Sequence, residues 1–293
     1  MYIGRFAPSP TGPLHFGSLV AAVASYADAR AVNGRWLLRI EDVDTTRCSR
    51  AAESEILRQL AAYGFAADGE VVRQSERGEI YDVAIARLAQ AGHVFACTCS
   101  RKMLEGASRN ADGESIYPGT CRDSDVVAGV HSLRLRVADN DDSRVEFTDR
   151  AVGVTRQNVA TGVGDFVLCR ADGCYAYQLA VAVDDAIQGV TDVVRGEDLL
   201  MNTPRQIYLQ RRLGVATPTY LHVPLARNAK GEKLSKQTLA QPIAVDAAIE
   251  TLHAAWAFLK QSDLQQTGSV DSFWKAAIAV WNPKLLQRHS PAM

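Results

Sequence analysis

The sequence lacks an excess of charge of either sign. Its 293 residues carry 32 Lys and Arg against 33 Asp and Glu, which leaves a formal net charge of -1. This balance argues against a protein that holds nucleic acid through bulk charge, because such proteins are strongly basic. Residues 194–293 nevertheless carry 12 basic and 7 acidic side chains. We therefore expect any contact with a polyanion to lie late in the chain.

Long apolar runs, low-complexity segments and internal repeats are also lacking. The longest nearly apolar stretch near the start, residues 19–27, is far shorter than the roughly 20 residues that span a membrane. The first residues lack the basic end and apolar run of a signal peptide, so we expect a cytoplasmic protein without a membrane contact. Apolar residues make up 47% and charged residues 22% of the sequence, which excludes a disordered chain.

The order of apolar patterns predicts an α/β fold with a parallel sheet. A strand over residues 2–6, a loop rich in proline, a helix from Ser18 and a strand over residues 36–40 form one βαβ unit. Amphipathic spacing and short apolar runs then predict two helices, a third helix and two more strands (residues 51–63, 78–91, 177–183, 190–194 and 220–224). We divide this core into residues 1–94 and 171–240.

An insertion separates the two parts of the core. Apolar and basic residues alternate over residues 133–137, which is typical of a half-buried strand and differs from the parallel pattern around it. We therefore expect a mainly antiparallel insertion at residues 95–170. Residues 241–293 predict a short helical region that packs three tryptophans in its core (Trp256, Trp274 and Trp281).

Two segments carry residues suited to phosphate. His15-Phe-Gly-Ser18 opens the first long helix, where unpaired N–H groups and a partial positive charge favour an anion. Gly17 lets a ligand approach the backbone, and His15 can donate to a phosphate oxygen. Lys233-Leu-Ser-Lys236 lies in a polar loop, and its lysines can neutralise departing charge. Taken alone, each segment is more typical of a structural feature, a capped turn for the first and a solvated basic loop for the second, whereas the pair indicates a nucleoside triphosphate site.

Together with Arg5-Phe-Ala-Pro-Ser-Pro-Thr-Gly12, these segments resemble the two signatures of class I aminoacyl-tRNA synthetases, and more narrowly those of the glutamyl branch. Residues 38–47 resemble the second strand of that family, whose glutamate holds the α-amino group of the substrate. Residues 177–198 resemble the segment that supplies a tyrosine and an arginine to the amino acid. The resemblance implies a Rossmann-like synthetase core that uses ATP as a substrate, with magnesium expected.

The resemblance also assigns residues to the two substrates. Glutamate is expected at five residues (Arg5, Ser9, Glu41, Tyr177 and Arg195), and ATP at six (His15, Gly17, Ser18, Lys233, Ser235 and Lys236). Three of these are expected to be catalytic (His15, Ser18 and Lys236). The chemistry agrees, because a carboxylate pairs with an ammonium group and guanidinium groups grip carboxylates through two hydrogen bonds. Structural ion pairs are the alternative for each charged residue, and Asp184 and Asp185 have no role beyond helix termination or structural bonding.

Three of the six cysteines are near one another in sequence: Cys97, Cys99 and Cys121. Three thiolates suit tetrahedral zinc, and the residues alone leave three candidates for a fourth ligand (His93, Tyr117 and Asp123). The spacing Cys-x-Cys…Tyr-x-x-x-Cys resembles the zinc site of the short glutamyl-queuosine tRNA(Asp) synthetases. That resemblance implies one structural zinc ion with Tyr117 as the fourth ligand. The other cysteines are expected to be free thiols (Cys48, Cys169 and Cys174).

The segment after Lys236 sharpens the resemblance. Only 57 residues follow this lysine, whereas the lysine loop of glutamyl-tRNA synthetases precedes a large anticodon-binding region, so we expect no such domain. The glutamyl-queuosine tRNA(Asp) synthetase family shares this shortness. Membership implies that L-glutamate and ATP form glutamyl-adenylate without tRNA. The glutamyl group then passes to the queuosine cyclopentenediol at the wobble position of tRNA(Asp), and we expect the enzyme to be a monomer.

Two other functions stay open from the sequence. A truncated glutamyl-tRNA synthetase would charge the 3′ end of a tRNA with the same activation chemistry. A zinc-containing synthetase paralogue without catalysis would only bind RNA, but both phosphate signatures are intact, which argues against it.

Overall fold

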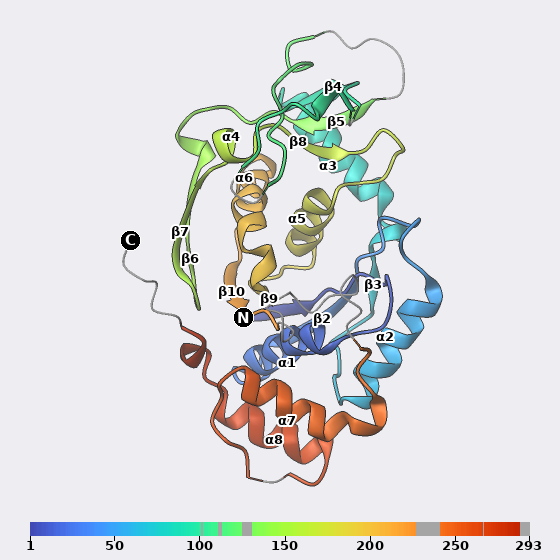
Figure 1. The fold of residues 1–293 in the computed structure, drawn as a ribbon, viewed down its shortest axis with the longest axis vertical. Coiled ribbons are helices and arrows are strands. Elements are labelled where there is room, and N and C mark those ends of the chain that lie inside the picture. Colours follow the sequence, from blue (N-terminus) through green and yellow to red (C-terminus); the bar gives the residue numbers. More distant parts are fainter. Residues whose placement is uncertain (101, 111–112, 125–130, 227–240, 266, 288–293) are drawn as a thin grey trace.

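The fold begins with the predicted βαβ unit, and the computed structural model describes residues 1–100, 102–110, 113–124, 131–226, 241–265 and 267–287 (Figure 1). β1 (Ile3–Phe6) and β2 (Arg35–Ile40) are parallel, with Gly4 paired to Trp36, and α1 (Phe16–Arg30) connects them. The short β3 (Val72–Arg73) adds a third parallel strand beside β2. The two further predicted helices are α2 (Arg50–Ala62) and α3 (Gly78–Gln90).

A second sheet holds the later parallel strands. β9 (Asp192–Gly196) and β10 (Thr219–Val223) pair in parallel, and α6 (Thr203–Leu213) connects them. Proline in the first turn starts α6, and Gly214 ends it in the left-handed conformation (φ 65°) that glycine tolerates. α5 (Tyr177–Ile187) precedes β9. The Thr191 N–H donates to the Ile3 carbonyl over 2.9 Å, which joins the two sheets.

The strands of the insertion divide between two sheets. β4 (Val94–Cys97), β5 (Ser132–Leu135) and β8 (Phe166–Cys169) form an antiparallel sheet at the top of Figure 1. The hairpin of β6 (Arg144–Asp149) and β7 (Gly153–Asn158) instead extends the sheet of β9 and β10. Neither β7 nor the short α4 (Val159–Gly162) was predicted. The boundary of the insertion at residues 95–170 stays a prediction.

The C-terminal helices pack against the first helix of the core. α7 (Ala248–Phe258) and α8 (Val270–Val280) lie beside α1 at the bottom of Figure 1. Ser269 and Ser272 form a capping box that starts α8. Trp256 and Trp274 are buried as predicted, but the expectation of a buried Trp281 was wrong, since this side chain is only partly buried. Its indole N–H instead donates to Asp28 over 2.8 Å.

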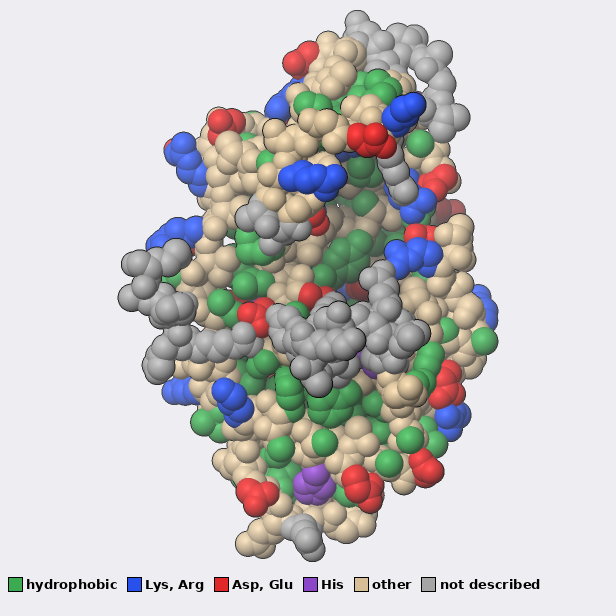
Figure 2. Space-filling model, in the orientation of Figure 1, with side chains coloured by type: hydrophobic (Ala, Val, Ile, Leu, Met, Phe, Trp, Pro, Cys, Tyr) green, Lys and Arg blue, Asp and Glu red, His purple; other side chains and the backbone are tan. Residues whose placement is uncertain are grey.

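The surface agrees with the balanced composition. Figure 2 shows one face of the molecule, where basic and acidic side chains interleave and the surface is hollowed near the middle. No helix in the part of the chain that the structure describes is long and apolar enough to cross a membrane.

Candidate active site

A cavity of about 380 Å³ lies where β1, β2, β9 and β10 end. Ligands of parallel α/β sheets commonly bind at the carboxyl ends of the strands, because the connecting loops meet there. Eight predicted residues line this cavity together (Arg5, Ser9, His15, Gly17, Ser18, Glu41, Tyr177 and Arg195). The other three, Lys233, Ser235 and Lys236, lie outside the described residues.

The start of α1 forms one wall of the cavity. His15 caps the helix, and its Nδ1 accepts the Ser18 backbone N–H over 3.2 Å. Because Nδ1 is an acceptor, a neutral ring carries its proton on Nε2, which lies 3.2 Å from the Ser18 hydroxyl. The ring therefore holds Ser18 in place at the positive end of the helix dipole, where an anion is stabilised.

Buried ion pairs form the opposite wall. The Arg39 Nη1 lies 2.8 Å from Asp185 Oδ1, and its Nη2 lies 3.3 Å from Glu41 Oε1. Asp185 also accepts from the Arg5 Nε at 3.2 Å. Burial alone would raise the pKa of Asp185, but the two guanidinium groups outweigh it and hold that pKa below its usual value. Asp185 is therefore a carboxylate that positions Arg5 and Arg39.

Asp184 binds residues away from the cavity. It accepts from the Arg77 Nε at 2.7 Å, and from the Tyr81 hydroxyl and Gln74 amide at 2.8 Å each. The expectation of structural bonding for this residue is confirmed. Arg39 and Asp185, however, were missed as neighbours of the site. Their signal was present as an arginine inside the apolar strand Trp36–Ile40 and an aspartate inside the apolar helix α5.

Glu41 follows β2 directly and is buried. Burial raises the pKa of this carboxyl above its usual value, although Arg39 and Arg5 act in the opposite direction. Tyr177, the first residue of α5, also lines the cavity, and burial next to Glu41 raises the pKa of its phenol to about 12. The pocket thus contains the carboxyl group of Glu41, whose ionised form a cationic partner would stabilise, and the phenol of Tyr177, which stays neutral.

Arg195 supplies a guanidinium group from β9. Its Nη2 donates to the Thr203 hydroxyl over 2.8 Å, and its Nε donates to His222 Nε2 over 3.1 Å. The buried Nη1 has no hydrogen-bond partner among the described residues, and Arg195 forms no ion pair within the described ranges. Since this side chain lines the cavity, its charge is suited to an anionic ligand.

The predicted cysteine cluster forms beside the antiparallel sheet. The sulfur atoms of Cys97, Cys99 and Cys121 all lie within 4.8 Å of one another. Tyr117 joins them, with its hydroxyl 3.3 Å from the Cys97 Sγ and 3.8 Å from the Cys99 Sγ. With Zn–S bonds of about 2.3 Å, sulfur ligands of a tetrahedral zinc ion lie about 3.8 Å apart, so the cluster fits such an ion.

The surroundings favour Tyr117 over the other two candidate ligands. Its hydroxyl accepts the Cys121 backbone N–H at 2.8 Å, and hydrogen bonds outweigh burial to lower the pKa of the Cys121 thiol to about 6. Asp123 pairs with Arg136 instead, and His93 does not belong to the group of ligand atoms that lie within 4.8 Å of one another. Cys48, Cys169 and Cys174 form no disulfide within the described part of the chain, where the three-cysteine cluster is the candidate metal group.

Comparison with known proteins defines the class. Residues 3–255 match the family of class I tRNA synthetases (E and Q), catalytic domain. A glutamyl-Q tRNA(Asp) synthetase from Verminephrobacter eiseniae is 51% identical over 291 residues, which covers 97% of this chain and 98% of the relative. The protein of that description from Dechloromonas aromatica is 52% identical over 295 residues, covering 99% and 97% of the two chains.

Solved structures share the fold. The glutamate-tRNA synthetase from Elizabethkingia anophelis has a TM-score of 0.77 at 22% identity, and the similarity covers 98% of this chain and 66% of that one. The chain thus spans just under two thirds of the length of that synthetase. The parallel α/β architecture is that of a class I synthetase catalytic domain. The chain belongs to the glutamyl-Q tRNA(Asp) synthetases, and it is a ligase.

Proposed function

We propose that the enzyme activates L-glutamate with ATP and transfers it to the queuosine cyclopentenediol at the wobble position of tRNA(Asp). The observation that carries the first half is the charge pattern of the cavity, which is lined by Arg5, Arg195 and Glu41 together with the start of α1. The second half is supported by the names of relatives about 50% identical over nearly the full chain.

The charges of the cavity suit an amino acid with two carboxylates. Glu41 takes the substrate ammonium group, whose charge offsets the cost of keeping this buried carboxyl ionised. Arg5, fixed by Asp185, and the buried Nη1 of Arg195 take carboxylates. Ser9 and Tyr177 complete the glutamate pocket, and the neutral phenol of Tyr177 can act as a hydrogen-bond donor.

ATP lies along the start of α1. Its phosphates bind at His15, Gly17 and Ser18, and the lysine segment 233–236 contributes Lys233, Ser235 and the catalytic Lys236. The glutamate α-carboxylate attacks the α-phosphorus in line, forming a C–O–P bond as pyrophosphate leaves. No side chain acts as a covalent nucleophile, so positioning and electrostatic stabilisation by His15, Ser18 and Lys236 lower the barrier. Magnesium bound with ATP would neutralise part of the phosphate charge. A hydroxyl of queuosine then attacks the carbonyl carbon, and AMP leaves.

The cysteine cluster would hold one structural zinc ion through Cys97, Cys99, Tyr117 and Cys121. Zinc would supply a cross-link between the end of β4 and the segment around Cys121. Four protein ligands close the coordination sphere, so the ion takes no part in the transfer step.

ATP–pyrophosphate exchange tests the activation half. The full chain, loaded with zinc, should exchange labelled pyrophosphate into ATP when glutamate is present and tRNA is absent. Absence of exchange under these conditions would overturn the proposal and favour a protein that only binds RNA.

The acceptor position needs a separate experiment. Queuosine-bearing tRNA(Asp) is glutamylated with labelled glutamate, and its 3′-terminal adenosine is then removed enzymatically. Label that stays on the tRNA supports the anticodon acceptor. Label that leaves with the adenosine would instead identify a synthetase that charges the 3′ end. Periodate oxidation is no substitute, since it destroys the queuosine diol as well as the terminal ribose.

A further inference from the structure

The guanidinium group of Arg195 is hydrogen-bonded to His222, a residue that neither the motifs nor the family assignment single out. His222 lies directly opposite it, since β9 and β10 pair with Arg195 and His222 in register. The Arg195 Nε donates to His222 Nε2 over 3.1 Å, and both side chains are buried. Thr203 holds a second guanidinium nitrogen at 2.8 Å. Only Nη1 lacks a partner among the described residues, so it is the nitrogen left for a ligand.

The contact with Arg195 determines which nitrogen of His222 carries the proton. An arginine Nε is always a donor, so His222 Nε2 must be an acceptor without a hydrogen. The proton of the neutral ring therefore sits on Nδ1, which lies 2.7 Å from Asp149 Oδ2. Asp149 and His222 are both fully buried. A carboxylate at this position selects the tautomer that Arg195 requires.

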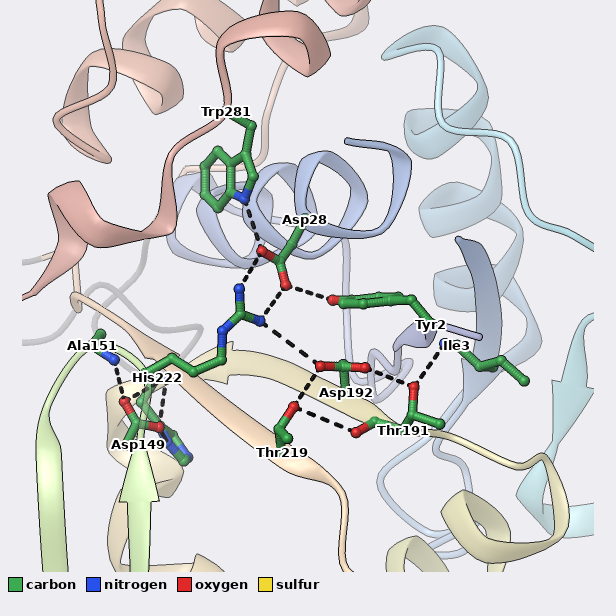
Figure 3. A network of polar contacts seen from close by, with 11 residues as sticks. Tyr2, Ile3, Asp28, Asp149, Ala151, Thr191, Asp192, Thr219, His222 and Trp281 are labelled. Carbon is green, nitrogen blue, oxygen red and sulfur yellow. Dashed lines mark hydrogen bonds and ion pairs between the residues drawn. The ribbon is translucent and has the colours of Figure 1, made fainter. Parts of the chain in front are cut away.

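Asp149 is itself held by the backbone of a turn. Its Oδ1 accepts the N–H groups of Ala151 and Val152 at 2.9 Å each, and its Oδ2 accepts the His222 N–H at 3.1 Å. Figure 3 shows this carboxylate between Ala151 and His222. Burial alone would raise the pKa of Asp149, but the His222 side chain, together with the backbone N–H groups of the turn, outweighs it and lowers that pKa. Hydrogen bonds thus fix each side chain between the turn and the cavity, namely Asp149, His222 and Arg195.

We infer that His222, with its tautomer set by Asp149, is a positioning residue that orients Arg195 toward a substrate carboxylate. A neutral acceptor at Nε2 aligns the guanidinium group without reducing its charge. A protonated ring would turn Nε2 into a donor facing a donor and would bring two cations together. This inference rests on the glutamate activation proposed above and adds a role for residues that do not touch the substrate.

The environment keeps the ring neutral. Burial lowers the pKa of His222, and Arg195 on β9 and Arg5 on β1 lower it further, whereas Asp149 on β6 opposes them. The Tyr220 ring of the same strand stacks against the imidazole with centroids 6.1 Å apart, and the Thr203 hydroxyl of α6 lies 3.3 Å from Nε2. We therefore expect the orienting contact to persist at neutral pH.

Two substitutions at His222 separate positioning from packing. In H222Q the side-chain oxygen can accept from Arg195, whereas H222L has similar bulk without an acceptor. We expect H222L to raise the KM for glutamate about 10- to 100-fold in ATP–pyrophosphate exchange, the range for losing a hydrogen bond to a charged group. The KM for ATP should stay unchanged, and H222Q should lie within about threefold of wild type. Equal glutamate KM values in H222L and H222Q would overturn the inference.

The Asp149→Asn variant tests the tautomer. Loss of the carboxylate removes the preference for Nδ1–H, so D149N should raise the glutamate KM although Asp149 touches neither Arg195 nor the cavity. D149N added to H222Q should have little further effect, because glutamine has no tautomer. Asp28→Asn is the matched control, since Asp28 is a buried carboxylate with similar bonding to Arg150 and Trp281. It should lower thermal stability and leave the glutamate KM unchanged.

A spectroscopic measurement keeps the inference testable if a variant fails to fold. Nitrogen-15 NMR of histidine-labelled wild-type protein should show the Nδ1–H tautomer of His222 between pH 6 and 9. An Nε2–H tautomer would overturn the inference whether or not glutamate is the substrate. Wild-type protein without glutamate-dependent exchange would instead contradict the proposed function, and the two failures are thereby distinguished.

Discussion

The charged side chains at the cavity and the thiols of the cysteine cluster are stabilised in opposite ways. At the cavity, Arg5 and Arg39 face Glu41 and Asp185, so buried charges compensate one another within the chain. At the cluster, three thiol groups and a phenol crowd together, and the nearby Arg134 guanidinium lies over the Tyr117 ring, 4.0 Å from its centroid. Thiol and phenol groups stabilise one another little, because each of them prefers a cation as its partner. Oppositely charged groups, in contrast, stabilise one another as ion pairs.

The difference indicates what each region requires to keep its shape. The cavity is organised before substrate arrives, and among the described residues that line it Arg195 keeps a buried guanidinium nitrogen without a hydrogen-bond partner. Preorganisation of this kind lowers the cost of ordering groups when the ligand binds. The cluster, in contrast, is expected to depend on a metal ion that comes from outside. Four predictions test this contrast.

Replacing Arg39 should have the largest effect. Arg39→Leu removes the cation shared by Glu41 and Asp185, which leaves the buried Glu41 without an ion pair among the described residues and Asp185 with Arg5 alone. We expect the free energy of unfolding to fall by about 3–5 kcal/mol, as measured by urea denaturation. Arg58→Leu is the control, because Arg58 forms an exposed pair with Glu55 that should contribute nothing measurable. Similar losses in both variants would contradict the view that the buried pairs organise the cavity.

Removal of the metal should have the next largest effect and should leave the cavity intact. If the free zinc concentration is about 100 times the Kd, removal of zinc by a chelator lowers the free energy of unfolding of this region by about 2.7 kcal/mol. Cys121→Ser should abolish zinc binding and make stability insensitive to chelator, while the glutamate KM stays unchanged. Cys169→Ser, at a free thiol outside the cluster, should retain one zinc ion per chain. Zinc content and thermal unfolding with and without chelator measure both variants.

Substitution of Glu41 should weaken glutamate binding selectively. Glu41→Gln removes the charge that pairs with the substrate ammonium group, so the glutamate KM should rise about 10- to 100-fold with little change for ATP. Glu53→Gln is a matched control, since Glu53 is a buried carboxylate paired with Arg73 away from the cavity.

Lys236→Ala should do the reverse of Glu41→Gln and lower kcat more than it raises the glutamate KM. Equal effects of both on kcat and KM would contradict separate subsites.

The pH dependence of glutamate binding should give the smallest effect. Burial raises the pKa of Glu41 above its usual value, and the substrate ammonium group binds the ionised form. Below that pKa the carboxyl must lose a proton before it binds, so affinity should fall as pH falls, by at most about tenfold per unit. Calorimetric titration of wild type and Glu41→Gln isolates this contribution, because the carboxylates of glutamate titrate identically in both. Parallel pH profiles would contradict it.

The parts of the site that local pattern predicts are those that follow apolar strands. Arg5 and Glu41 stand at the ends of β1 and β2, where a reader of the sequence can place them at one edge of a sheet. The grouping of Cys97, Cys99 and Cys121 was predicted from spacing and is confirmed. Their zinc ion stays a prediction.

His222 could not be found in this way. A single histidine inside an apolar strand has no local signal, and its meaning arises from the pairing of β10 with β9, whose contacting residues are 27 positions apart. The position of the β6–β7 hairpin in the second sheet could not be predicted for a related reason. Alternating residues predict a strand but not which sheet it joins, and that choice depends on the single parallel pair of Tyr220 with Asp149.

The end of β6 and the residue after it direct two adjacent side chains to different partners. Asp149 reaches His222, while its neighbour Arg150 grips Asp28 through two hydrogen bonds of 2.6 and 2.9 Å. Asp28 also binds Tyr2 and Trp281, as Figure 3 shows. A deletion of one residue before Asp149 would therefore place the guanidinium group of Arg150 opposite His222 and leave Asp28 facing Ala151 instead of a cation. The turn can change its exposed side chains during evolution, but it cannot change its length.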